Sequence, residues 1–249
     1  MRLPKATFFS FLILLTLPTL TIRAQLLPKD SLINDTAYAT AIHQYHVYTA
    51  PETGLYRGPQ YVDYDYTVQK GQPFFGPDSF RVGTIRYNGF LYAHVPLLYD
   101  LVKDQVIIND PYKVYKISLF MDLVEGFTIE DHVFILLKDS LNPSAPRSGF
   151  YEQLYQGRII LLKREKKSLQ ENLALPTDNI RTFIDSSVSF YLKKAGTWYP
   201  IDSKGLLLKA LKERRAEVRK FIRNSNLSWH DDKEQLLLKV VLWYDGFNQ

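Results

Sequence analysis

Residues 84–110 read "TIRYNGFLYAHVPLLYDLVKDQVIIND", and their pattern decides the fold that we expect. Apolar and polar side chains alternate on both sides of Asn88-Gly89, a dipeptide that takes the positive φ angles of a type I′ turn and so predicts a β-hairpin. A second hairpin is expected where "LLYDL" and "QVIIN" flank the charged break "VKD". Both faces of the strand after Gly89 carry apolar groups, which is typical of a central strand that is covered on both sides.

The period of two continues over residues 82–201. Turn signals divide this region into about nine or ten short strands, spaced as in antiparallel sheets, at Asp122, residues 130–132, Gln156-Gly157 and Ala195-Gly196. The basic run "KREKK" (163–167) is expected to end a strand or to lie at a sheet edge, where lysines discourage edge-to-edge association.

The chain after residue 201 changes to the period of an α-helix. In "DSKGLLLKALKERRAEVRKFIRNSN" (202–226), apolar side chains recur on one face and the outer face is basic, as in an amphipathic helix. Asp202 or Ser203 is expected to cap this helix, and residues 224–226 to end it.

A second helix is predicted by "HDDKEQLLLKVVLWYDGF" (230–247), with Asp231 and Glu234 spaced as a capping box and Gly246 at the stop. It is apolar nearly all round, so we expect it to be buried between the sheet and the other helix. The predicted fold class is therefore α+β, a predominantly antiparallel β-sheet or open barrel with two C-terminal α-helices.

The N-terminus, "MRLPKATFFSFLILLTLPTLTIRAQ", has the parts of a secretory signal peptide. A basic start precedes an uncharged run, Ala6–Leu20, that is shorter than the roughly 20 residues of a membrane span, and the small Ala24 follows. We predict cleavage before Gln25 and export to the periplasm or the outer surface. The alternative is an uncleaved N-terminal anchor. The chain then divides into a signal peptide (1–24), an N-terminal segment with a Tyr-rich arm (25–81), the antiparallel β region (82–201) and a helical hairpin packed on the sheet (202–249), with 25–249 expected to form one domain.

Composition excludes several classes of function. The 31 Lys and Arg residues outnumber the 26 Asp and Glu residues, but Arg2, Lys5 and Arg23 would leave with the signal peptide, so the mature chain carries only +2. Nucleic-acid binding needs a persistent basic surface and is not expected. The chain has no cysteine, which excludes disulfides, thiolate chemistry, a cysteine-based zinc site and a cysteine lipid anchor.

We expect no cofactor and no metal. His43 and His46 have a spacing of three residues, at which two imidazoles on a helix can share a metal, but no third ligand follows at a diagnostic distance. The chain lacks G-x-S-x-G, G-x-x-x-x-G-K and H-E-x-x-H.

Three segments carry a resemblance: "YNGFLYAHVPLLYDLVKDQVI", "GFYEQLYQGRIILLKRE" and "WYPIDSKGLLLKALKERRAEVRKFIRNSNL". Their order, together with the leader ending in "RAQ", resembles a family of uncharacterised exported proteins of Bacteroidota, hypothetical proteins with no established activity. The resemblance covers most of the mature chain. It implies location and architecture, and it transfers no catalytic residue.

Two stretches are candidate binding surfaces. Flat amphipathic rings bind sugars and peptides, and they are dense in the arm, at Tyr56, Tyr61, Tyr64, Tyr66, Phe74 and Phe75. The alternative is that these rings pack the arm onto the sheet. The segment Lys204 to Arg223 holds eight basic and two acidic residues, and Lys212, Arg215 and Arg219 would face an anionic membrane surface or an acidic partner, or else simply be solvated.

The sequence therefore favours a non-catalytic binding or scaffolding protein of the cell envelope, with an envelope protein or a glycan as its partner. Two alternatives remain. One is a hydrolase acting on envelope glycans or peptides, for which Asp63, Asp65 and His132 are candidate residues, although His132 is also explained by a β-turn. The other is a membrane-surface adaptor that uses the basic helix.

Overall fold

The computed structural model describes residues 54–64, 68–138, 142, 144–172 and 181–246. Contacts divide the chain into Met1–Asn34 and Asp35–Gln249, and every described residue belongs to the second unit. The predicted signal peptide, His43, His46, Asp65 and Tyr66 lie outside the described residues. Within the described residues, no helix is long and apolar enough to cross a bilayer.

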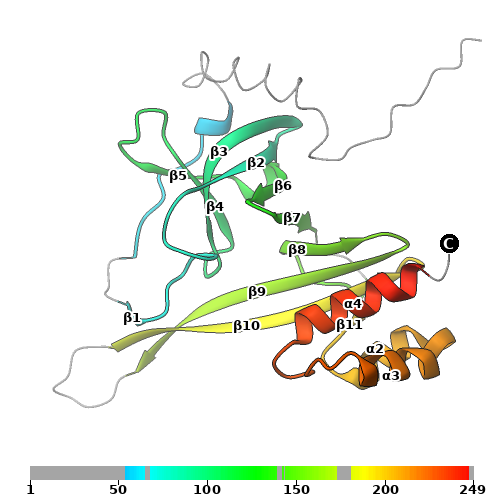
Figure 1. The fold of residues 1–249 in the computed structure, drawn as a ribbon. Helices are drawn as coiled ribbons and strands as arrows, with labels where there is room; N and C mark the ends of the chain where they lie inside the picture. The colour runs from blue at the N-terminus through cyan, green and yellow to red at the C-terminus, as the bar shows by residue number, and fades with distance from the viewer. Residues whose placement is uncertain (1–53, 65–67, 139–141, 143, 173–180, 247–249) are drawn as a thin grey trace, which may run out of the picture. The chain divides into compact units, whose positions relative to one another are not determined.

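The strands form one open sheet, in the order β1-β10-β9-β8-β7-β6-β2-β3-β4-β5, with β11 beside β10. Every pairing is antiparallel except that of β1 with β10. The strands are β1 (Val68–Lys70), β2 (Arg81–Tyr87), β3 (Phe90–Asp100), β4 (Gln105–Asn109), β5 (Lys116–Ser118), β6 (Val124–Ile129), β7 (His132–Leu137), β8 (Gly149–Gln156), β9 (Ile159–Asn172), β10 (Arg181–Lys194) and β11 (Thr197–Pro200). The predicted α+β class with a mainly antiparallel sheet is confirmed, and the sheet is open rather than closed (Figure 1).

The turns follow from local chemistry. Asn88 and Gly89 have φ angles of 51° and 81°, as a type I′ hairpin requires, and Ala195 and Gly196 repeat the pattern at 47° and 79°. Glu130, at 52°, makes the turn between β6 and β7. The strand after Gly89 is central as predicted, because β3 lies between β2 and β4 and its residues Leu97–Asp100 are all buried.

The basic run 163–167 does not end a strand, which was one of its two predicted positions. The register between β8 and β9 stops at Lys163, so the rest of the run pairs with β10 alone, as the sheet-edge alternative expects. The run lies in the middle of β9, which pairs with β10 over 14 residues from Ile159↔Lys194 to Asn172↔Arg181. Two of the lysines are engaged by neighbouring segments. Lys163 pairs with Glu152 of β8, and the Nζ of Lys167 donates to the backbone carbonyls of Gln72 and Phe74. Because these partners stabilise the charges in place, the strand continues through them.

The first predicted helix is divided in two. It forms α2 (Lys204–Ala210) and α3 (Arg215–Asn224), separated by a 3-10 turn, η4 (Lys212–Arg214). Ser203 caps α2 as expected, accepting a hydrogen bond from the N–H of Leu206. The break falls at Leu211, whose φ and ψ of −104° and 39° are not helical.

The last helix, α4, spans Lys233–Gly246. The predicted capping box is wrong, because Asp231 accepts from the Ser228 hydroxyl and Glu234 pairs with Lys163 of β9. Asp232 precedes the first helical residue instead, and its carbonyl accepts from the N–H of Leu236. The predicted burial of α4 is confirmed, since Leu236, Leu237, Val240, Val241 and Tyr244 are all buried.

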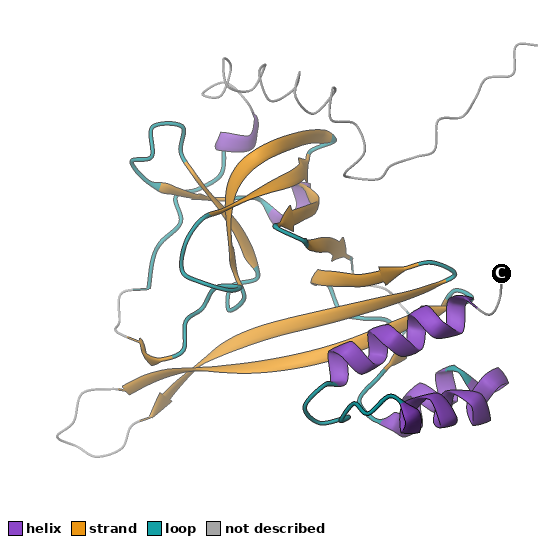
Figure 2. Ribbon diagram, viewed as in Figure 1, coloured by secondary structure: helices purple, strands orange, loops and turns teal. Residues whose placement is uncertain are grey.

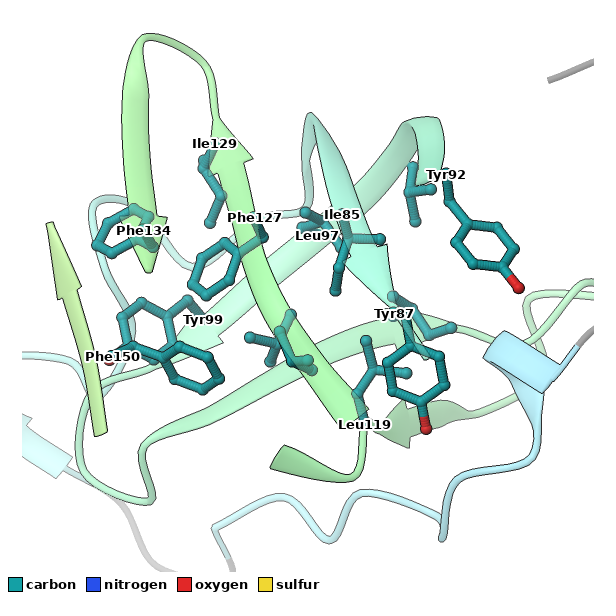
Figure 3. Packing of buried hydrophobic residues seen from close by; sticks show 14 of the residues in the cluster. Ile85, Tyr87, Tyr92, Leu97, Tyr99, Leu119, Phe127, Ile129, Phe134 and Phe150 are labelled. Carbon is teal, nitrogen blue, oxygen red and sulfur yellow. The ribbon is translucent and has the colours of Figure 1, made fainter. Parts of the chain in front are cut away.

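Two main cores flank the sheet. One lies among β2–β8 and is aromatic: the rings of Phe127 and Phe134 stack at 4.7 Å, and Tyr99 and Phe150 meet them edge to face (Figure 3). The other lies where α2, α3 and α4 cover β9 and β10, and it contains Leu161, Leu192 and the apolar faces of the helices (Figure 1). A third, small cluster joins Tyr61 and Phe74 of the arm to Leu98 and Ile107.

Candidate functional site

The tyrosine arm packs against the sheet through its rings. Tyr61, Phe74 and Phe75 are buried, and Tyr56 is partly buried against the aromatic core. Tyr61 and Phe74 cover the face of β3 and β4 that is opposite the aromatic core, because Leu98 and Ile107 alternate along those strands with core residues. The arm therefore supplies the second cover of the central strand, and these rings do not form an exposed platform.

One carboxylate fixes the arm in place. Asp100, which is fully buried, accepts hydrogen bonds at Oδ2 from the hydroxyls of Tyr61 (2.9 Å) and Tyr64 (2.7 Å). Its Oδ1 accepts from the backbone N–H groups of Val102 and Lys103 in the β3–β4 turn. The Lys103 ammonium lies 4.3 Å from the ring centres of both tyrosines. Burial and the Asp100 carboxylate raise the pKa of Tyr61, so its hydroxyl stays a donor.

The arm also covers the free edge of β5. The N–H of Tyr61 donates to the carbonyl of Lys116, and the N–H of Ser118 donates to the carbonyl of Pro59. Gly58 lies so close to this edge that a Cβ would stand 2.1 Å from the Ser118 carbonyl oxygen. Since an open strand edge invites pairing with other chains, this stretch protects the sheet.

The hydrolase candidates are not brought together. Asp63 pairs with Lys116 at 2.5 Å, whereas the Nδ1 of His132 donates to the Oε1 of Glu152 at 2.5 Å. Glu152 is buried and also pairs with Lys163 at 3.1 Å, which in turn reaches Glu234 at 2.8 Å. Burial lowers the pKa of Lys163, but the bonds to Glu234 and Glu152 outweigh it and the net shift is upward. Sequence reasoning missed Glu152, whose strand pattern gives no sign of a partner 20 residues earlier.

The segment α2–η4–α3 carries the strongest local charge. Its exposed cations, defined here as the basic face, are Lys204, Lys209, Lys212, Arg215, Arg219, Lys220 and Arg223. The predicted Lys212, Arg215 and Arg219 are all among them, and all three are exposed, whereas Val218 of α3 is buried. Lys220 and Arg223 extend the set that the sequence singled out.

The acidic residues of the same segment are engaged elsewhere. Glu213 pairs with Lys194 of β10 and accepts from the hydroxyl of Tyr244 of α4, and Glu217 pairs with Arg214 at 3.0 Å. Among the described residues, no ion pair involves any member of the basic face. Arg215, Arg219 and Arg223 are spaced i, i+4 and i+8, at which like charges destabilise a helix by about 0.2–0.5 kcal/mol per pair.

No group of three or more His, Cys, Asp or Glu side chains able to hold a metal occurs in the described part of the chain. Comparison of the chain with protein-family models, with curated proteins and with solved structures gave no match. The resemblance to exported Bacteroidota proteins stays a prediction. We therefore infer function from the arrangement of the chain's own residues.

Proposed function

We propose that the protein is an exported, non-catalytic binding protein of the cell envelope that uses its basic face to hold an anionic envelope protein or glycan. The observation that carries this proposal is the set of seven exposed cations on α2–η4–α3 without an ion-pair partner among the described residues. A mature chain of only +2 concentrates its positive charge there, so attraction is local rather than general.

Rigidity supports the same function. The middle residue of η4, Glu213, is joined to Lys194 at the end of β10 and to Tyr244 of α4. Val218 of α3 is buried. A cationic face on a fixed helix loses less side-chain and backbone freedom on binding than one on a loop does. Its mutual repulsion in the free protein would be relieved by an anionic partner.

The test uses purified residues 25–249 on two immobilised polyanions, poly-glutamate and an acidic polysaccharide, eluted with increasing salt. The variant Arg215→Gln/Arg219→Gln/Arg223→Gln is compared with Lys138→Gln/Arg147→Gln/Lys166→Gln, which removes three exposed cations from other elements. We expect the first variant to elute at clearly lower salt and the second to elute close to the wild type, because only cations within about a Debye length of the bound polyanion contribute to its attachment. Equal elution of both variants would mean that net charge alone is responsible.

Two alternative functions are each supported by a feature of the structure and predict a different experimental result. The membrane-surface adaptor would use the same basic face, and it predicts binding to vesicles containing phosphatidylglycerol that the triple Arg variant abolishes. The hydrolase alternative has the buried Glu152 that orients His132, an arrangement suited to a general base. It predicts turnover of an envelope glycan or peptide that His132→Ala abolishes without unfolding the protein.

A further inference from the structure

Residues 110–115 form the loop between β4 and β5 (Figure 2). One carboxylate, that of Asp110, orders its backbone. Asp110 is buried although it lies in a loop. Its side chain accepts from the backbone N–H of Tyr112 at Oδ2 (2.9 Å) and from those of Val114 and Tyr115 at Oδ1, while its carbonyl accepts from the N–H of Lys113. Lys113 takes a φ of 57°, which lets the chain fold back over the carboxylate.

These bonds account for every backbone donor of the tip. Pro111 has no N–H, and the N–H groups of residues 112–115 all donate to Asp110. Loops in water usually leave some of these N–H groups to bond with solvent. Because every N–H of this tip already has an acceptor within the loop, the backbone can enter an apolar environment without leaving a donor unpaired.

The side chains of the same tip point the other way. Tyr112, Val114 and Tyr115 are 75%, 80% and 45% exposed, and the first two are the most exposed large apolar residues that the structure describes. Val62 of the arm, 73% exposed, follows Tyr61, whose N–H bonds to Lys116 at the base of the loop. Lys113 is the exposed cation of residues 110–115, and the only carboxylate of this stretch is the buried Asp110.

We propose that this tip, Tyr112 to Tyr115, docks the protein on a lipid bilayer, with the apolar side chains entering the interface between headgroups and acyl chains. Tyrosine and lysine are suited to that depth, because one end of each side chain is apolar and the other is polar. Valine adds apolar area, and the tip carries no exposed negative charge to oppose anionic headgroups.

The backbone N–H groups of residues 112–115 all have acceptors within the loop, and this favours lipid over other ligands of the tip. A peptide that adds as a strand needs free backbone N–H groups as partners, and this tip has none left to offer. The tip is held in one conformation before it binds, so little ordering entropy is lost on insertion. This site is separate from the basic face, and it goes beyond the proposed function rather than depending on it.

The absence of cysteine in the chain makes a site-specific test simple. Val114→Cys of the mature chain is labelled with a polarity-sensitive fluorophore, with Ser187→Cys, an exposed position on β10, as the matched control. Phosphatidylcholine vesicles, with and without phosphatidylglycerol, are then titrated in. We expect the label at 114 to brighten and shift to shorter wavelength with both vesicles, more with the anionic ones, and the label at 187 to stay unchanged. The triple Arg variant of the basic face should leave the signal at 114 in place.

Two further variants fix the cause. In the Val114→Cys background, Tyr112→Ser/Tyr115→Ser should weaken vesicle binding at least about tenfold, because two rings no longer bury apolar area. Asp110→Asn should also weaken it, because an amide cannot accept all three N–H groups, while far-UV circular dichroism stays unchanged. No shift at 114 with millimolar lipid of either kind would overturn the proposal. A shift that appears on concentrating the protein without lipid would overturn it as well, and would indicate association of two copies.

Discussion

The hydroxyl of Tyr61 donates a 2.9 Å hydrogen bond to Asp100, which lies 39 residues later and is fully buried. For Tyr61 this distinguishes the two interpretations of the tyrosine-rich arm, because a ring that is 4% exposed has no face left for a ligand. Tyr64 makes the same bond at 2.7 Å. Tyr61 and Tyr64 therefore anchor the arm on the sheet.

Asp100→Ala is expected to destabilise the protein by about 3 kcal/mol, because two tyrosine hydroxyls and two backbone N–H groups lose a buried acceptor. Tyr61→Phe/Tyr64→Phe removes only the hydroxyl donors and should cost about 1–2 kcal/mol, since Asp100 keeps its two backbone donors. Urea unfolding followed by circular dichroism measures both. A cost for Asp100→Ala below that of the double variant would contradict this account.

Glu152→Gln is expected to cost about 2 kcal/mol, because the side chain is buried between His132 and Lys163 and its charge compensates that of the lysine. His132→Gln should cost less than half as much, since the imidazole is 41% exposed and its loss leaves Glu152 paired. Thermal unfolding of the two variants provides the comparison. If His132→Gln proves to be the more damaging, the histidine rather than the lysine holds the carboxylate.

Asp110 predicts a pH dependence confined to one loop. Burial by itself raises the pKa of this carboxyl, but the bonds from Tyr115, Tyr112 and Val114 outweigh burial and hold the pKa below its usual 3.8. A carboxyl with a depressed folded-state pKa stabilises the loop above 3.8, and that contribution is lost as the pH falls through the folded-state value. The protection factors of the amides at residues 112, 114 and 115 (intrinsic divided by observed exchange rate) should therefore stay constant from pH 7 to about 5 and fall only below about 4.

The matched control for this loop is the turn at Ala195-Gly196, where no carboxylate of the described residues accepts from a backbone N–H. Its amides should show no such change relative to their intrinsic rates. Protection of residues 112, 114 and 115 that persists at pH 2 would show that the carboxylate is not what orders the tip.

The sequence predicts this fold well where the cause is local. Asn88-Gly89 and Ala195-Gly196 specify their own hairpins through positive φ, and Ser203 specifies the start of α2. Asp110-Pro111 is a local signal too, because Asp before Pro is a typical start for a loop in which the carboxylate accepts backbone N–H groups.

The features that the sequence did not predict depend on distant partners. The charges of 163–167 predicted the end of a strand or a sheet edge, but the strand continues because Glu152, Gln72 and Phe74 stabilise two of the lysines within β9. The break at Leu211 has no Gly or Pro near it, and it coincides with the bond from Glu213 to Lys194. The sequence does not indicate that Asp100 is the partner of Tyr61, because 39 residues separate them.

The last prediction concerns Lys194 of β10, which fixes the position of η4 beneath the basic face through its bond to Glu213. Its ammonium bonds to Glu213 and to the hydroxyl of Tyr244 (2.9 Å), so β10, η4 and α4 meet at one nitrogen. Lys194→Met keeps the apolar stem but removes these bonds, and we expect the free energy of unfolding to fall by about 1–2 kcal/mol.

In this variant Glu213 would lose its lysine partner, and its carboxylate could neutralise Lys212 or Arg215. Elution from poly-glutamate should shift to lower salt in this variant, although no residue of the basic face has changed. Lys166→Met, on an exposed part of β9, removes the same charge and should shift neither stability nor elution. A Lys194→Met protein that is less stable but elutes like the wild type would show that Glu213 has no influence on the basic face.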